Sequence, residues 1–117
     1  MNTRKTGSEK EQIAAAYLKK NGYEIVEQNY RCRFGEIDLI VRKDGYLIFV
    51  EVKYRAGGGQ GGAFAAVDYR KQKIISRVAM QYMCYRKLPD DVPCRFDVVA
   101  ITGERIEHMA NAFDFCG

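Results

Sequence analysis

The 117-residue sequence is poor in the residues on which several common kinds of site depend. It has one histidine, His108, and four cysteines that form no CxxC pair: Cys32, Cys84, Cys94 and Cys116. Zinc sites normally need closely spaced Cys or His ligands, so we expect reduced thiols rather than zinc. No apolar run is long enough for a signal peptide or a membrane span, so we expect a cytoplasmic protein without a membrane partner.

The composition is that of one globular domain, which we take to cover residues 1–117, with 47% hydrophobic and 29% charged residues. The formal net charge is only +4. Positive charge is concentrated between Asp68 and Leu88, where one acidic residue accompanies six basic ones: Arg70, Lys71, Lys73, Arg77, Arg86 and Lys87. This local excess indicates a polyanionic partner.

A hairpin is predicted at Asp44-Gly45, because these residue types adopt the positive φ angles of a two-residue turn. In that register one face carries three apolar pairs: Ile37–Val52, Leu39–Val50 and Val41–Ile48. The other face carries two charged pairs: Asp38 opposite Glu51, and Glu36 opposite Lys53. A β-bulge would shift this pairing by one residue.

The predicted Asp38–Glu51 pair places two carboxylates face to face, with Cβ atoms roughly 4.5–5.5 Å apart, where like charges repel. A divalent cation would offset the repulsion, and Mg²⁺ is typically held by one or two carboxylates with waters and phosphates. Lys53 could then position a metal-bound water or bind a phosphate. The alternative is an ordinary exposed polar face with a Lys–Glu pair and no metal.

A first helix is predicted to begin at Ser8, which forms a capping box with Glu11, and to end at Asn21-Gly22. Residues 1–7 are expected to be frayed. The apolar stripe of this helix is Ile13, Ala14, Tyr17 and Leu18. Glu11 can therefore serve either the helix, by bonding the Ser8 backbone N–H, or a metal ion.

A second helix is predicted from Asp68, its N-cap, to Lys87. Its buried stripe is Ile74, Ile75, Val78, Ala79, Tyr82 and Met83. Lys71 continues this stripe and should point towards the sheet, although a lysine with a buried stem and a solvated end is the alternative. A different face carries Arg70, Lys73 and Arg77.

Strands are predicted at residues 23–32, in the hairpin and at 94–102, with a short last strand around Ile106. Five glycines within residues 57–62 exclude a helix or strand there and predict a mobile loop at 56–63. A linker between domains is the alternative, but neither flank is long enough to be a domain. The order is α-β-β-β-α-β, an α/β fold with a mixed sheet flanked by helices.

Asp38 and the segment Glu51-Val52-Lys53, after a helix that bears Glu11, resemble the PD-(D/E)XK nuclease superfamily, whose core is restriction-endonuclease-like. Longer stretches resemble the YraN-like family of uncharacterised proteins, regarded as endonucleases and distantly similar to archaeal Holliday junction resolvases. These stretches are GSEKEQIAAAYLKKNGYEIVEQNYRCRFGEIDLI, FVEVKYR and RFDVVAI. The resemblance extends from about residue 7 to residue 113.

The resemblance implies a set of site residues. Asp38, Glu51 and Lys53 would be catalytic, and the metal ligands for Mg²⁺ or Mn²⁺ would be Glu11, Asp38 and Glu51. In resolvase-like members a Lys or Gln of the next helix reaches the site, and Lys71 and Gln72 match it. The sequence departs from the pattern at two positions: Ile37 replaces a proline, and Lys10 stands where relatives often have glycine.

The implied function is metal-dependent hydrolysis of phosphodiester bonds in DNA, with no small-molecule cofactor. Nucleic-acid contacts are expected from Arg31, Arg33, Arg70, Lys71, Gln72, Lys73 and Arg77. No base-reading motif is evident, so a structure-specific endonuclease acting on branched or junction DNA is favoured. A homodimer is expected by analogy with resolvases.

Two other classes of function remain open. A non-catalytic nucleic-acid-binding or adaptor protein could keep the nuclease scaffold, and it would respond to DNA but not to metal ions. A protein-interaction domain could use the sheet edge near Ile106, although no residue points specifically to it. Metal-dependent thermal stabilisation would separate the nuclease from both.

Overall fold

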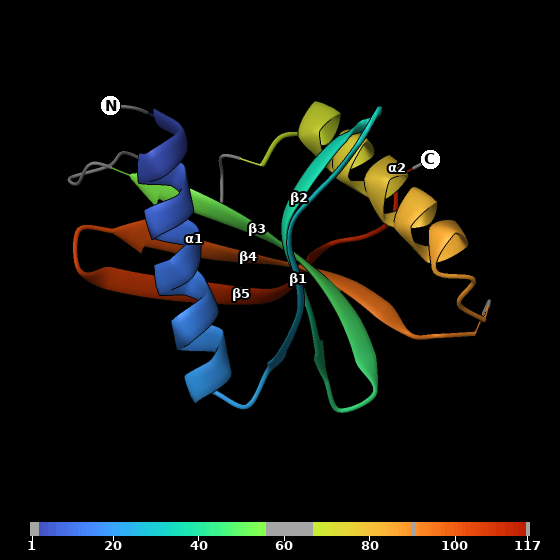
Figure 1. Ribbon diagram of the computed structural model, residues 1–117, viewed down its shortest axis with the longest axis horizontal. Helices are drawn as coiled ribbons and strands as arrows, with labels where there is room; N and C mark the ends of the chain where they lie inside the picture. Colours follow the sequence, from blue (N-terminus) through green and yellow to red (C-terminus); the bar gives the residue numbers. More distant parts are fainter. Residues whose placement is uncertain (1–2, 56–66, 90, 117) are drawn as a thin grey trace.

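Five strands form one sheet between two helices in a computed structural model that describes residues 3–55, 67–89 and 91–116 (Figure 1). The elements, in order, are α1 (Thr3–Lys20), β1 (Glu24–Cys32), β2 (Gly35–Lys43), β3 (Tyr46–Arg55), α2 (Tyr69–Tyr85), β4 (Cys94–Thr102) and β5 (Arg105–Phe113). The strands lie in sequence order across the sheet, with β3 and β4 parallel and all other neighbours antiparallel. The predicted α/β class with a mixed sheet and two helices is confirmed.

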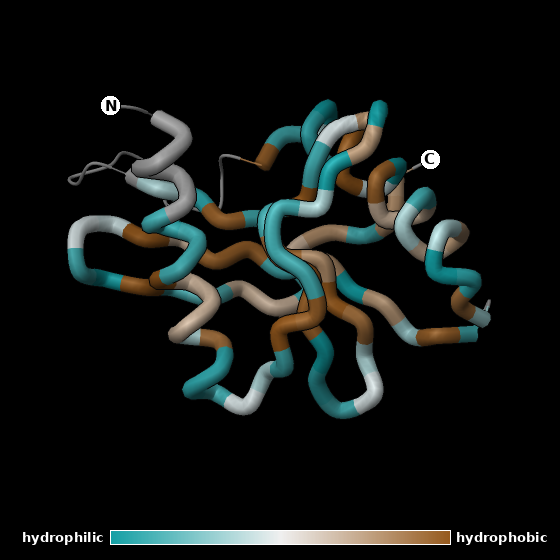
Figure 2. The backbone as a smooth tube through the Cα atoms, in the orientation of Figure 1, coloured by the Kyte–Doolittle hydropathy of each residue, from teal (hydrophilic) through white to brown (hydrophobic). Residues whose placement is uncertain are grey.

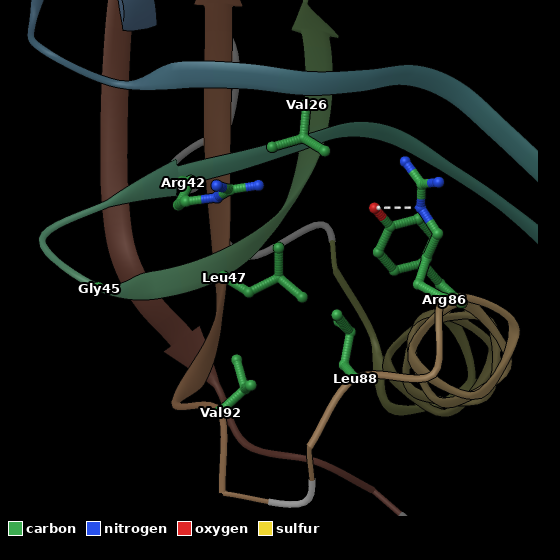
Figure 3. Close-up of a pocket in the computed structure, with 8 residues that line it drawn as sticks. Val26, Arg42, Gly45, Leu47, Arg86, Leu88 and Val92 are labelled. Atoms are coloured by element: carbon green, nitrogen blue, oxygen red, sulfur yellow. Dashed lines mark hydrogen bonds between the residues drawn. The ribbon is translucent and has the colours of Figure 1, made fainter.

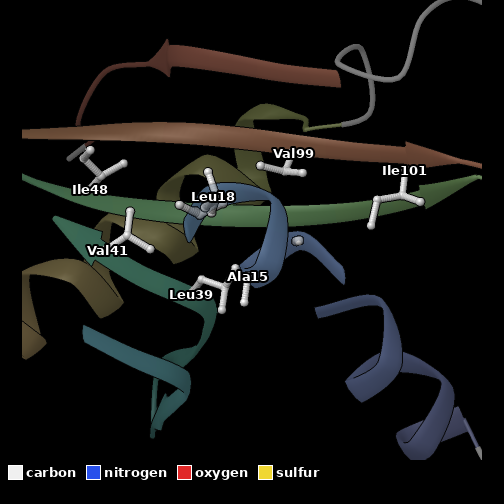
Figure 4. Packing of buried hydrophobic residues seen from close by; sticks show 9 residues of the cluster. Ala15, Leu18, Leu39, Val41, Ile48, Val99 and Ile101 are labelled. Atoms are coloured by element: carbon white, nitrogen blue, oxygen red, sulfur yellow. The ribbon is translucent and has the colours of Figure 1, made fainter. Parts of the chain in front are cut away.

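The two helices cover opposite faces of the sheet. Under α1 the buried cluster is Ala14, Ala15, Leu18, Leu39, Val41, Ile48, Val50, Val99 and Ile101 (Figure 4). Under α2 it is Ile37, Ile40, Leu47, Phe49, Ile75, Val78, Ala79, Tyr82 and Phe96. Hydrophobic residues follow the central strands, and the β2–β3 turn is hydrophilic (Figure 2). No helix in the described part of the chain has the length and apolar character needed to cross a membrane.

Helix α1 begins earlier than predicted. It starts at Thr3, so Ser8 lies inside the helix and the prediction that Ser8 is the N-cap is wrong. An N-cap contributes only about 1 kcal/mol, so the backbone hydrogen bonds of the additional turns can compensate for the loss of the Ser8 cap. Ile13 is 41% exposed, and the small residues Ala14 and Ala15 contact the sheet instead.

The predicted end of α1 is confirmed. The Gly22 N–H donates to the Lys19 carbonyl and the Tyr23 N–H to that of Leu18, while Gly22 has a φ of +91°. Glycine suits this left-handed position because it has no Cβ.

The hairpin turn and its register are confirmed near the turn. Lys43 pairs with Tyr46, Asp44 and Gly45 both have positive φ, and the ladder runs to the pair Leu39–Val50. Beyond that pair the prediction is wrong, because β2 leaves β3 and continues only with β1. The predicted pairs Asp38–Glu51, Glu36–Lys53 and Ile37–Val52 are therefore not formed.

The side-chain alternation of β2 shifts at the same point. Leu39 and Val41 are buried under α1, whereas Ile37 is buried under α2. The predicted apolar face that joins Ile37 to Leu39 is thus wrong. A strand that turns away from one neighbour can rotate its side chains, and here the rotation occurs at Asp38.

Helix α2 agrees closely with its prediction. Asp68 is the N-cap, and its carboxylate accepts a hydrogen bond from the Lys71 N–H at 2.9 Å. Most of the predicted stripe is buried, although Ile74 is 37% exposed. The glycine-rich loop predicted at 56–63 lies outside the described residues. The last strand, β5, is longer than the short strand expected around Ile106.

A fully buried carboxylate joins β4 to β5. Asp97 accepts hydrogen bonds from Arg95 at 3.0 and 3.2 Å and from the Asn111 N–H at 2.9 Å. Its Oδ2 also lies 2.8 Å from His108 Nε2, and Arg95 donates a further bond to the Tyr23 hydroxyl. These partners compensate a charge that burial would otherwise penalise.

Candidate metal site

Three carboxylates come together where β2 separates from β3. Glu11 projects from α1, and Glu36 and Asp38 project from β2. One oxygen of each lies within 4.8 Å of the others. Two oxygens on opposite sides of a bound Mg²⁺ are about 4.2 Å apart, so a small adjustment would let all three ligate one ion. The group can therefore hold a divalent cation.

The end of the β2–β3 ladder fixes the position of Asp38. The Val52 N–H donates to Asp38 Oδ2 at 2.8 Å, so a side chain accepts the bond that a β2 carbonyl would accept in a continued ladder. Asp38 also contributes an oxygen to the three-carboxylate group.

The environment of this group disfavours negative charge. Burial raises the pKa of Asp38 to about 8, with further contributions from the negative charges of Glu51, Glu11 and Glu36. Burial also raises the pKa of Glu11 above its ordinary value, although hydrogen bonds with Asp38 and Asn29 oppose this. Perturbed carboxylates of this kind cluster at functional sites, and a bound cation would relieve the repulsion.

Glu51 stands beside the three-carboxylate group rather than in it. It is 7% exposed, and its Oε2 lies 3.5 Å from both Lys53 Nζ and Lys71 Nζ. The structure therefore brings together Glu11 and Asp38 of the predicted ligands, with Glu36 as the third carboxylate. Glu51 remains close enough for its charge to raise the pKa of Asp38.

The two candidates on the first turn of α2 point to different places. Lys71 points towards the sheet, as predicted, and reaches Glu51. The amide of Gln72 is engaged elsewhere: its nitrogen donates to the Val67 carbonyl at 3.0 Å, and its oxygen lies 3.6 Å from Cys116 Sγ.

The other predicted DNA contacts lie on the outside of this region. Arg31 forms an ion pair with Glu36 at 2.9 Å. The Arg33 guanidinium lies over the Phe34 ring, 5.0 Å from its centroid. The remaining three, which are Arg70, Lys73 and Arg77, line one small pocket together with Phe34 and Ile74.

Sequence reasoning missed two residues of this region. Glu36 is two positions from Asp38, so alternation along a strand placed both on one face, and that signal could have identified it as a third ligand. The signal for Phe34 was weaker. It is an aromatic residue between Arg33 and Gly35, in the segment that connects the predicted strand 23–32 to the hairpin.

A larger pocket of about 430 Å³ lies near the β2–β3 turn and the C-terminal end of α2 (Figure 3). It is lined by Val26, Arg42, Gly45, Leu47, Tyr82, Arg86, Leu88 and Val92. Arg86 Nε donates to the Tyr82 hydroxyl at 3.4 Å. Its described lining has no carboxylate, thiol or imidazole.

Comparisons with known proteins give one consistent family. Residues 10–101 match the model of Uncharacterised protein family UPF0102. A UPF0102 protein of Lachnoclostridium phytofermentans is 47% identical over 117 residues, which cover 100% of this chain and 99% of the relative. A UPF0102 protein of Nitrosomonas europaea is 48% identical over 111 residues, covering 92% of each. The chain therefore belongs to the UPF0102 family.

Proposed function

We propose that this protein is a metal-dependent endonuclease that hydrolyses phosphodiester bonds in DNA. The observation that carries the proposal is the group of Glu11, Glu36 and Asp38, whose oxygens lie within 4.8 Å of one another. Carboxylate oxygens are the ligands that Mg²⁺ and Mn²⁺ prefer. The lysines beside Glu51 add the positive charge that a phosphate substrate requires.

Each residue of the site has a distinct task in this proposal. Glu11, Glu36 and Asp38 would hold the ion, and the Val52 N–H orients the Asp38 carboxylate. The ion would supply a Lewis acid and lower the pKa of a bound water. Glu51 positions Lys53 and Lys71, whose ammonium groups can donate to phosphate oxygens as negative charge develops there.

The sequence motif also supports a nuclease. The spacing of Asp38 and Glu51-Val52-Lys53 resembles the PD-(D/E)XK nucleases, and the order of helices and strands agrees with their core. Exposed basic residues, among them Arg31, Arg70 and Lys73, surround the site and suit phosphate contacts, which bind without regard to sequence. Because phosphate contacts carry no sequence information, the proposal favours a structure-specific DNA substrate.

A second candidate is a nucleic-acid-binding protein without turnover. It is favoured by one observation: Lys53 and Lys71 both lie 3.5 Å from Glu51 and compensate its charge. Such a protein would keep the basic surface but gain nothing from Mg²⁺.

A cleavage assay tests the proposal. Labelled duplex, branched, nicked and single-stranded DNA is incubated with the protein in Mg²⁺, Mn²⁺ or EDTA. We expect cleavage only with a divalent ion, and its loss in Asp38→Asn. The matched control is Asp44→Asn, the same change at the exposed tip of the same hairpin, which should remain active. Cleavage by Asp38→Asn at the wild-type rate, or none by the wild type, would reject the nuclease.

A further inference from the structure

A pocket of about 250 Å³ lies between the β1–β2 turn and the N-terminal half of α2. These two segments approach one another at the upper edge of the view in Figure 1. We call it the Phe34 pocket, and it is lined by Phe34, Arg70, Lys73, Ile74 and Arg77. Three of these five side chains are cationic and one is aromatic, so the pocket suits an anion that carries a flat ring.

Close packing fixes the turn that carries Phe34. Gly35 has a φ of +148°, and a Cβ at this position would come within 2.7 Å of the Ile74 side chain. A Cβ here would force the Ile74 side chain or its helix to shift, and side chains other than glycine rarely adopt this φ. Phe34 directly precedes this close contact, and its ring lies beside the helix, 5.7 Å from the Arg77 guanidinium carbon.

The cations around the ring contact aromatic faces: Arg33 and Arg77 lie over Phe34, and Lys73 Nζ lies over the Tyr69 ring, 5.5 Å from its centroid. The guanidinium carbons of Arg33 and Arg77 lie 5.0 and 5.7 Å from the Phe34 ring centroid. Within the described ranges, neither they nor Arg70 and Lys73 form an ion pair with a carboxylate. Proteins that bind single strands combine these same features, an aromatic platform for a base and positive charge for the backbone.

The Phe34 pocket adjoins the acidic group through two short connections. Phe34 is two residues from Glu36, a span of roughly 7 Å in an extended chain. On the helix, Arg70 and Lys73 line the pocket, and the nearby Lys71 reaches Glu51, which stands beside the acidic group. One nucleic-acid strand could occupy both places at once.

We propose that the Phe34 pocket binds one unpaired nucleotide of the DNA strand whose neighbouring phosphate lies at the acidic group. The base stacks on Phe34 in place of a guanidinium group that lies over the ring, and Arg70, Lys73 and the displaced Arg77 contact its phosphates. A base inside a duplex has both faces covered by its neighbours, so the pocket selects DNA with an unpaired arm or gap. This inference rests on the proposed nuclease function and specifies its substrate.

Binding in EDTA tests the inference without cleavage. The probes are a labelled blunt duplex and the same duplex with a single-stranded arm. We expect the wild type to prefer the armed DNA, and Phe34→Leu to lose about 5- to 150-fold in affinity for it, with the duplex changed by less than about twofold. Phe34→Tyr keeps a ring and should keep the preference. Tyr85→Leu changes an aromatic residue that is 64% exposed at the other end of α2, outside the pocket lining, and is the matched control.

A second measurement uses the unaltered protein, so it does not depend on the folding of a variant. A 2-aminopurine base in the unpaired arm should be quenched on binding, whereas the same base in the duplex should not. Equal quenching in both places, no quenching, or equal weakening of both DNAs by Phe34→Leu would overturn the inference.

The two proposals can fail separately. Metal-dependent cleavage with no preference for unpaired DNA would reject the Phe34 pocket and leave the nuclease. A preference for unpaired DNA in EDTA, retained by Asp38→Asn, with no cleavage under any condition, would support the pocket as a binding site and reject the nuclease.

Discussion

Asp38 accepts a hydrogen bond from the backbone N–H of Val52 at 2.8 Å, at the point where β2 and β3 cease to pair. This contact satisfies a donor that the divergence of the strands leaves without a carbonyl partner. It also holds a carboxylate among three others in a half-buried place. The hydrogen bond from Val52 favours a carboxylate at this position, whereas burial and the neighbouring carboxylates disfavour its negative charge.

The stability of the metal-free protein should fall as the pH rises from about 5 to 7. The pKa of Asp38 is about 8 in the folded protein against an ordinary value of 3.8, so only the folded state keeps the proton in this range. A carboxyl group whose pKa is raised on folding lowers the free energy of unfolding as the pH increases, here by roughly 1–3 kcal/mol. Asp38→Asn, which can still accept the Val52 bond, should remove this slope in urea unfolding with EDTA. If the wild type and Asp38→Asn showed the same dependence of stability on pH, the raised pKa of Asp38 would be contradicted.

Divalent ions should stabilise the wild type through the three-carboxylate group. At a Mg²⁺ concentration about tenfold above its Kd, the gain in unfolding free energy is about 1.4 kcal/mol. Glu36→Gln and Asp38→Asn should each lose most of the gain, measured as the shift of the melting temperature with Mg²⁺. Glu24→Gln removes an exposed carboxylate of β1 and should respond like the wild type. An equal response of all variants would place the ion elsewhere.

Lys53 and Lys71 should act on the substrate rather than on the metal. Lys53→Ala and Lys71→Ala are each expected to keep the Mg²⁺-dependent melting shift and to lower kcat roughly 100-fold, because a donor to developing negative charge is removed. Lys19→Ala, at an exposed position of α1, controls for the loss of one charge. Unchanged kcat would mean that both lysines only compensate Glu51.

The basic face of α2 should account for part of the salt dependence of DNA binding. Lys73→Ala combined with Arg77→Ala is expected to flatten the plot of log K against log salt by roughly one to two units, at about 0.9 per phosphate contact. Lys19→Ala with Lys20→Ala removes the same charge from the end of α1 and should change the slope less. Equal slopes for the two double variants would indicate a purely long-range effect.

Asp97 should be a stability residue without a role in binding. Burial alone would raise the pKa of this carboxyl, but hydrogen bonds from His108, Arg95 and the Asn111 N–H outweigh it and hold the pKa below its ordinary value. Its contribution is therefore present near neutral pH and is lost as the pH falls through that lowered pKa. Asp97→Asn should cost about 3–5 kcal/mol in urea unfolding, because Arg95 loses its buried partner.

Asp114→Asn, an exposed change of the same kind, is the control for Asp97 and should be near neutral. A stability loss in Asp97→Asn as small as in this control would show that the buried bonds contribute little.

Local sequence signals predicted the parts of the fold that depend on neighbouring residues. Asp44-Gly45 determines its turn, and Asp68 caps α2, because both act through the adjacent backbone. Helical periodicity likewise placed Lys71 towards the sheet. Each of these predictions needed only a few consecutive residues.

The features that were not predicted depend on segments distant in sequence. The pairing of β2 with β3 ends at Leu39–Val50, while β1 continues with β2 on one side and β4 with β3 on the other. No property of the hairpin alone specifies that point. The membership of Glu36 in the acidic group follows from it, and the Phe34 pocket requires α2 to pack on the β1–β2 turn.

The one parallel pair of the sheet bears on how the chain folds. β1, β2 and β3 pair with sequence neighbours, whereas β4 must reach β3 across the whole of α2. Long-range pairing carries the larger loop-closure cost and tends to form late. The strands that bear Glu36, Asp38 and Glu51 would then meet before Lys71 arrives with its helix. Repulsion among these carboxylates would then add to the kinetic barrier to folding, and it would be relieved at Glu51 only when Lys71 arrives.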